Sequence, residues 1–261
     1  MTQIIHVVLD VQGIDAGFWV NDIPVGALRY RRSLHLAVPI HEYLVNGENT
    51  LRIVRTDPPA EGETQRAEEL VASMTVAGFA VGARPGIDPG DVMSTLRLRV
   101  SGSPAQGSQT AQGSFRQVAW PHLWVWQSLP AYDWSGAKAA AQVAQYLRTF
   151  ADRFQLGDVA WLLAALLPKM SDYCTAYGLD LRAESAELAA RMARRLADPS
   201  FKMTPFADAD LVLQPCAKGR LVDCTLKSGE TAIRWHDARA GDRGAMLLRL
   251  GYADRALRVF R

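Results

Sequence analysis

Alternation of apolar and polar residues dominates the first hundred or so positions of the chain. Leu34, Leu36 and Val38 alternate with charged or small residues, as do Leu98 and Val100 further on. This period of two is what a strand with one buried face requires. The pattern recurs between turn residues, which is typical of an antiparallel β-sandwich. The expected strands are residues 4–11, 18–20, 23–30, 33–38, 49–55, 69–81 and 93–100, with loops at 57–69 and 101–114.

Beyond residue 135 the apolar spacing changes to three and four. Val143, Leu147, Phe150 and Phe154 fall on one stripe of a helix expected over residues 136–155. Two more helices are expected, the first starting after residue 158 and the second over residues 184–196. Short apolar runs after them predict strands at 209–214, 220–227, 230–235, 245–250 and 255–260.

Specific residues mark where these elements begin and end. Asp158 is expected to cap the second helix through its carboxylate, because first-turn amides have no partner inside a helix. Pro168 should kink or divide that helix, and Gly178 should close it. Ser228-Gly229 predicts a tight hairpin turn between two late strands.

The fold class that follows is α+β. We expect an N-terminal antiparallel β-sandwich over residues 1–118 and a Trp-rich connector over 119–135. Residues 136–261 should then pack helices against an antiparallel sheet.

Two segments of the sandwich carry a motif. The stretch FWVNDIPVG, residues 18–26, breaks a short strand at Asn21-Asp22. The second segment follows the pattern Y-L-x-x-G-E-N-x-L through Tyr43, Leu44, Gly47, Glu48, Asn49 and Leu51. Together they resemble the jelly-roll lid modules of bacterial glycosidases, in which a Gly usually stands where this chain has Asp22. The resemblance implies an architecture, and such sandwiches serve many functions.

The C-terminal half resembles the NTF2-like cone of the SnoaL and ketosteroid-isomerase superfamily. Leu156-Gly157-Asp158-Val159, followed by Leu162-Leu163 and Pro168, is similar to that family's G-D-x-x-x-L-x-x-L helix entry. The resemblance implies helices covering one face of a curved sheet. It leaves open an enzyme that would place a carboxylate in an apolar cavity.

Composition and charge limit the class of protein and the kinds of partner that it can bind. A hydrophobic content of 49% indicates a globular protein, and a net charge of +2 argues against a general nucleic-acid binder. Residues 1–130 hold 10 Lys/Arg against 12 Asp/Glu, and residues 131–261 hold 19 against 15. The start, MTQIIHVVLDV, alternates like a strand, so we expect no signal peptide, no membrane segment and a cytoplasmic protein. Cys174, Cys216 and Cys224 lack CxxC spacing and are expected to be buried thiols.

Catalytic patterns are not expected. His236-Asp237 sits at the entry of a charged loop, and its two side chains would point to opposite faces of a strand. Asp172, Tyr173 and Cys174 would not share one helix face. Arg84 lies in GARPGIDPG, a loop whose Gly and Pro follow from turn geometry. We expect no catalytic residues, no cofactor and no metal site.

Two surfaces are candidates for partner binding. Trp120, His122, Trp124 and Trp126 are spaced by two and would share one side of a strand. This is either a recognition patch for a protein or sugar, or a seal between domains, which we favour. The other surface is an acidic loop suited to a cationic cleft, made by Glu61, Glu63, Glu68 and Glu69.

These features favour a non-enzymatic protein-binding module. The whole chain resembles bacterial immunity proteins of type VI secretion, which implies a cognate toxin or effector protein as partner, blocked over about 800 Å² per side. A homodimer is also possible, whereas nucleic acid and membrane are not expected as partners. Two alternatives stay open: an NTF2-like isomerase or dehydratase acting on a small apolar molecule, and a carbohydrate-binding accessory protein.

Overall fold

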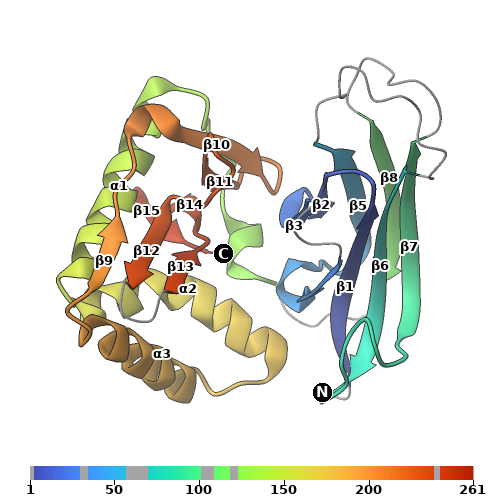
Figure 1. The fold of residues 1–261 in the computed structure, drawn as a ribbon, viewed down its shortest axis with the longest axis horizontal. Helices are drawn as coiled ribbons and strands as arrows, with labels where there is room; N and C mark the ends of the chain where they lie inside the picture. The colour runs from blue at the N-terminus through green and yellow to red at the C-terminus, as the bar shows by residue number, and fades with distance from the viewer. Residues whose placement is uncertain are drawn as a thin grey trace. The chain divides into compact units, whose positions relative to one another are not determined.

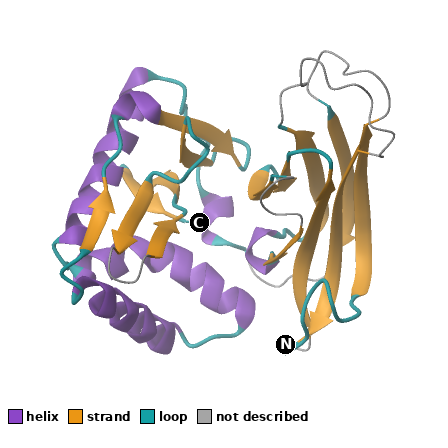
Figure 2. Cartoon of the chain, viewed as in Figure 1, coloured by secondary structure: helices purple, strands orange, loops and turns teal. Residues whose placement is uncertain are grey.

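A computed structural model shows a mixed α+β protein dominated by its sheets (Figures 1 and 2). The chain divides into two compact units, residues 1–122 and residues 123–261. The division lies inside the Trp-rich stretch expected to connect two domains. The structure describes residues 3–29, 35–56, 70–100, 109–117, 123–237 and 242–260, except for the side chains of residues 237 and 242.

The first unit contains two four-stranded antiparallel sheets. One has the order β4-β1-β6-β7 and the other β3-β2-β5-β8. The strands are β1 (Gln3–Gln12), β2 (Ala16–Val20), β3 (Ile23–Leu28), β4 (His35–Pro39), β5 (Gly47–Arg55), β6 (Leu70–Ala80), β7 (Asp91–Val100) and β8 (Thr110–Gln117). A short 3-10 helix, η1 (His41–Tyr43), precedes β5.

Both sheets of this unit contribute to one apolar core. Val7 and Leu9 of β1 and Phe18 of β2 are fully buried in it, together with Ile53 of β5. Burying a side chain of this size stabilises the folded state by roughly 1.5–3 kcal/mol. On β7 the expected alternation is confirmed, because Leu98 and Val100 are buried while Arg97 and Arg99 are exposed.

Two sequence expectations fail in this unit. Residues 110–114 were expected to be loop, yet they form most of β8, which pairs with β5 along its full length. Their Gly, Ser and Gln residues are tolerated because β8 is an edge strand that buries chiefly Phe115. Leu36 is 37% exposed rather than buried, since β4 is also an edge strand. Leu34 lies outside the described residues.

The second unit packs its helices and strands around another apolar core (Figure 1). The described part has three α-helices: α1 (Ala137–Gln155), α2 (Val159–Tyr177) and α3 (Leu181–Leu196). Its sheets have the orders β10-β11-β14-β15 and β13-β12-β9. The strands are β9 (Phe201–Thr204), β10 (Leu211–Cys216), β11 (Leu221–Leu226), β12 (Ile233–Asp237), β13 (Asp242–Met246), β14 (Arg249–Ala253) and β15 (Ala256–Val259). Two short 3-10 helices, η2 (Val125–Ser128) and η3 (Asp208–Asp210), complete the unit.

Capping residues set the helix ends largely as expected. The Asp158 carboxylate accepts a hydrogen bond from the Trp161 amide at 3.1 Å, and Gly178 adopts the left-handed conformation that closes α2. Pro168 does not divide α2, which runs unbroken through it. Asp180 caps α3 by accepting from the Ala183 amide, so this helix begins earlier than residue 184.

The chain changes sheets at the predicted turn Ser228-Gly229. The turn forms, since the Gly229 amide donates to the Leu226 carbonyl at 2.7 Å. Instead of pairing with β11 as a full hairpin, β12 joins β9 and β13 in the other sheet. Strand β9, which the sequence analysis missed, is only four residues long and follows directly on the end of α3.

Candidate functional site

A ten-residue turn, residues 81–90, joins β6 to β7 in the first unit and exposes large apolar side chains. Ile87 within the turn is 72% exposed, and Val81 at its start and Val92, the second residue of β7, are each 66% exposed. Large apolar side chains left exposed are candidates for contact with another protein. We call these three side chains the turn surface.

An exposed ion pair links two residues of the turn. The Arg84 guanidinium donates to Asp88 at 3.0 and 3.3 Å, and the backbone amide of Arg84 donates to the same carboxylate at 2.7 Å. Hydrogen bonding from Arg84 lowers the pKa of the Asp88 carboxyl below its ordinary value. The guanidinium of Arg84 is therefore already bound to a carboxylate of its own turn.

The base of the turn is pinned to the sheet. The ring of Phe79 lies on Gly90, where a Cβ would stand 2.7 Å from the ring. The edge of His6 meets the same ring at a centroid distance of 5.5 Å. Gln3, at the start of β1, donates to the Asp91 carboxylate at the start of β7. These contacts fix the direction in which the turn leaves the sheet.

The tip of the turn is held against His35. Gly86 has a φ of +84°, and a Cβ there would stand 2.4 Å from Nε2 of that ring. His35 is in turn bonded to Asp10 through its Nδ1 at 2.6 Å. Glycine is thus required at position 86 both by its conformation and by the close approach of the imidazole.

A turn braced at tip, middle and base presents its apolar groups in one arrangement before any partner arrives. Such preorganisation lowers the entropy cost of binding, because few bonds remain to be immobilised. The arrangement suits a shallow apolar pocket on another protein.

The partner-binding residues expected from the sequence are not brought together in the described structure. Glu61, Glu63, Glu68, Glu69 and Trp120 lie outside the described residues, as does His122. Trp124 and Trp126 do not belong to a strand: Trp124 precedes η2 and Trp126 lies within it. Both are buried, at 1% and 4% exposure, so these two indoles form no exposed platform.

Two buried carboxylates of the second unit accept hydrogen bonds. Asp223 on β11 and Arg249 on β14 stand directly opposite each other, and Nε donates to the carboxylate at 2.8 Å. Asp172 on α2 accepts from the Val125 amide at 3.1 Å. Each of these carboxylates therefore helps to hold a neighbouring element in place: Asp172 holds the segment at Val125, and Asp223 holds Arg249 of the next strand.

The three cysteines are free and buried, as expected for structural thiols. Burial raises the pKa of the Cys224 thiol, and of the Cys174 thiol as well, which disfavours the reactive thiolate. Residue Leu213 stands opposite Cys224 and Leu221 opposite Cys216, so the two strand cysteines do not form one register pair.

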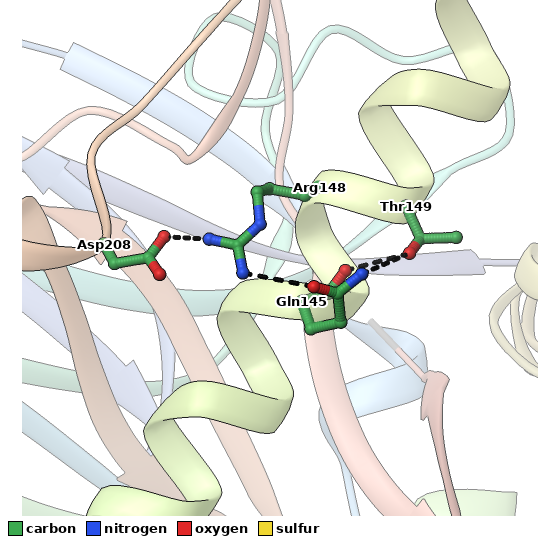
Figure 3. A network of polar contacts seen from close by, with 4 residues as sticks. All are labelled: Gln145, Arg148, Thr149 and Asp208. Atoms are coloured by element: carbon green, nitrogen blue, oxygen red, sulfur yellow. Dashed lines mark hydrogen bonds and ion pairs between the residues drawn. The ribbon is translucent and has the colours of Figure 1, made fainter.

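A polar network on α1 also serves packing (Figure 3). The Arg148 guanidinium lies between the Asp208 carboxylate and the Gln145 side chain, to which it donates at 3.2 Å. The Thr149 hydroxyl donates to the backbone carbonyl of Gln145 at 3.0 Å. This network ties η3 to α1 at the surface, where an exposed ion pair contributes about 0–1 kcal/mol.

Neither a metal site nor a spanning helix is found in the described residues. No three side chains of His, Cys, Asp or Glu gather there around a position for an ion. His236 lies on β12 with its ring exposed. No helix among these residues combines the length and apolarity that crossing a bilayer requires.

Comparison with known proteins adds no relative, since no family model, curated protein or solved structure matches the chain. What the protein binds is therefore inferred from its own surface. The turn surface escaped the sequence analysis because Val81, Ile87 and Val92 are scattered among turn residues and follow no period. The signal that was available is Ile87 itself, an apolar residue between Gly86 and Asp88 in a segment without a core to join.

Proposed function

We propose that this chain is a non-enzymatic protein-binding module that occludes a cognate bacterial toxin or effector. The observation that carries the proposal is the turn surface, in which Ile87 is largely exposed on a segment braced by Arg84 and Asp88. A soluble domain gains nothing for its own stability by holding an isoleucine in water. Apolar anchors at the centre of an interface commonly contribute most of its affinity.

The architecture supports the same proposal. The first unit holds two four-stranded antiparallel sheets over one apolar core, which supports the sandwich that the lid-module resemblance implies. In the second unit the described strands form two separate sheets, and the interior is filled by apolar side chains such as Leu147, Phe150 and Leu250. Folds of this kind can serve as scaffolds, with loops that carry the binding function.

Binding should be measured against the product of the gene adjacent to the one that encodes this chain, by pull-down and then by titration calorimetry. We expect a stoichiometric complex. Changing Ile87→Glu should weaken it at least tenfold, because a charge would have to be desolvated in an apolar pocket.

The matched control is Leu156→Glu in the second unit. Leu156 is 79% exposed, so the same change of chemistry is made at a comparably open position. Its affinity should stay within twofold of the unaltered chain. Failure of the unaltered chain to bind, or equal losses in both variants while circular dichroism shows both folded, would contradict the proposal.

A further inference from the structure

We infer that the outer face of the sheet β13-β12-β9 binds an acidic segment of a protein. Three basic residues, Lys202 on β9, His236 on β12 and Arg243 on β13, carry the inference. They stand in one line across the three strands, and we call them the basic row. The site lies in the second unit and does not depend on the turn surface.

Strand register brings these residues together although they are far apart in sequence. His236 is paired with Lys202 on one side and with Arg243 on the other. Residues directly opposite each other in an antiparallel sheet project to the same face. Because neighbouring strands lie about 4.8 Å apart, the row spans about 10 Å of the surface.

The opposite face of the same sheet belongs to the core. Phe201, Ile233 and Trp235 alternate with members of the row and are buried among helix side chains. Trp235 lies under the guanidinium of Arg195, 5.1 Å from its ring centroid. The alternation therefore turns the basic row outward, and all three of its side chains are exposed.

The two fixed positive charges of the row, on Lys202 and Arg243, each stand opposite His236 and have no acid directly opposite them in the described sheet. Elsewhere in this unit guanidinium groups meet acids, as in the pairs Arg234 with Glu230 and Arg153 with Asp158. In the described part of the chain the row makes no such ion pair, and an anionic ligand would supply the missing charge.

The surface favours a carboxylate-rich peptide over a single-stranded nucleic acid. Bases bind by stacking on exposed aromatic side chains, which supply about 1–3 kcal/mol each. None of the exposed large apolar residues among those described belongs to β9, β12 or β13. Acidic side chains need only the cations, and in an extended peptide alternate residues project to one side.

The net charges of the two halves of the chain also favour an acidic ligand for the second unit. Residues 131–261 hold 19 Lys/Arg against 15 Asp/Glu, an excess of four positive charges, whereas residues 1–130 have an excess of two negative charges. A basic half with a concentrated row attracts acidic segments from solution and raises their association rate.

The test uses fluorescein-labelled poly-L-glutamate and a labelled oligothymidylate of similar length, with the full chain titrated at low salt and followed by anisotropy. The double variant Lys202→Glu/Arg243→Glu should bind poly-L-glutamate at least tenfold more weakly than the unaltered chain. The residual binding should depend less on salt, because fewer ion contacts are made.

The control Lys138→Glu/Arg182→Glu makes the same change in net charge at two exposed residues of α1 and α3. It should bind the peptide within threefold of the unaltered chain. Equal losses in both double variants would reduce the effect to net charge and overturn the inference. Tighter binding of oligothymidylate, lost in the Lys202→Glu/Arg243→Glu variant, would overturn it in favour of a nucleic-acid site.

Two checks keep the outcomes separable. Thermal melts must show that the row variant is folded; if it is not, Lys202→Gln/Arg243→Gln replaces it with the same expected direction. The Ile87→Glu variant should bind poly-L-glutamate like the unaltered chain. The row and the turn surface can therefore fail independently.

Discussion

The side-chain amide of Asn21 donates a hydrogen bond to Oδ1 of Asn49 at 2.7 Å. One residue comes from the turn between β2 and β3 and the other from the start of β5. Asn49 is completely buried, and its side chain also accepts from the Val45 amide and donates to the Val45 carbonyl. Asn21 of the first motif segment and Asn49 of the second are therefore joined in one polar network. This network holds the chain in place where it enters β5.

Removing that network should destabilise the first unit. Asn49→Ala removes a fully buried side chain and its hydrogen bonds to the part-buried backbone of Val45, which we expect to lower the free energy of unfolding by about 2–3 kcal/mol. Asn46→Ala is the control, because Asn46 is an exposed asparagine three positions away. Urea unfolding of both variants measures the difference, and equal midpoints would show that the network is dispensable.

Strand and helix content was largely predictable because it rests on local periodicity. The apolar stripe of Val143, Leu147 and Phe150 indicates a helix whatever element packs against it. The cap of the next helix is also local, because Asp158 accepts from the amide of Trp161, three residues later. Strand pairing is not local. Nothing near Ile233 or Phe201 in sequence says that β12 leaves β11 to pair with β9.

The candidate surfaces were predictable only in part for the same reason. The basic row exists because register aligns Lys202, His236 and Arg243, and no spacing along the chain encodes that. The tryptophan pattern misled because Trp124 and Trp126 flank and enter a 3-10 helix, where a spacing of two does not place side chains on one face.

The brace of the turn surface should be visible in the ionisation of Asp88. Its pKa lies below the ordinary 3.8 because Arg84 stabilises the carboxylate. A depressed pKa adds stability above pH 3.8, and this contribution is lost as the pH falls through the folded-state value. A carboxyl-carbon NMR titration should show the low pKa in the unaltered chain and its return toward 3.8 in Arg84→Ala. An unchanged pKa in that variant would show that the guanidinium does not hold the carboxylate.

The buried pair of Asp223 and Arg249 should respond to substitution asymmetrically. Asp223→Ala removes the carboxylate that is paired with a guanidinium only 3% exposed, which we expect to cost about 3–5 kcal/mol of unfolding free energy. The double variant Asp223→Leu/Arg249→Met replaces both charges with apolar groups and should regain most of that loss. Chemical denaturation of the single and double variants tests this, and a double variant no more stable than Asp223→Ala would contradict it.

Tyr146 on α1 should ionise well above the ordinary tyrosine pKa of 10. Burial raises its pKa to about 12, although the nearby Arg258 opposes the shift. A raised pKa favours the neutral phenol in the folded state, so its contribution to stability is complete below pH 10 and falls as the pH approaches 12. Absorbance at the phenolate band should show a titration step near pH 12, and Tyr146→Phe should remove that step; a step that persists in the variant would contradict the assignment.

The sheet change at Ser228-Gly229 has a consequence for the order in which the second unit assembles. Strands β10 and β11 pair between residues close in sequence, since Cys216 lies opposite Leu221, five positions later. Strands β9 and β12 pair across a much longer loop, since Thr204 lies opposite Arg234, thirty positions later. Closing the longer loop costs more chain entropy before any pairing repays it. Binding competence at the basic row should thus be gained late during folding and lost early during unfolding, while the helical core is still intact.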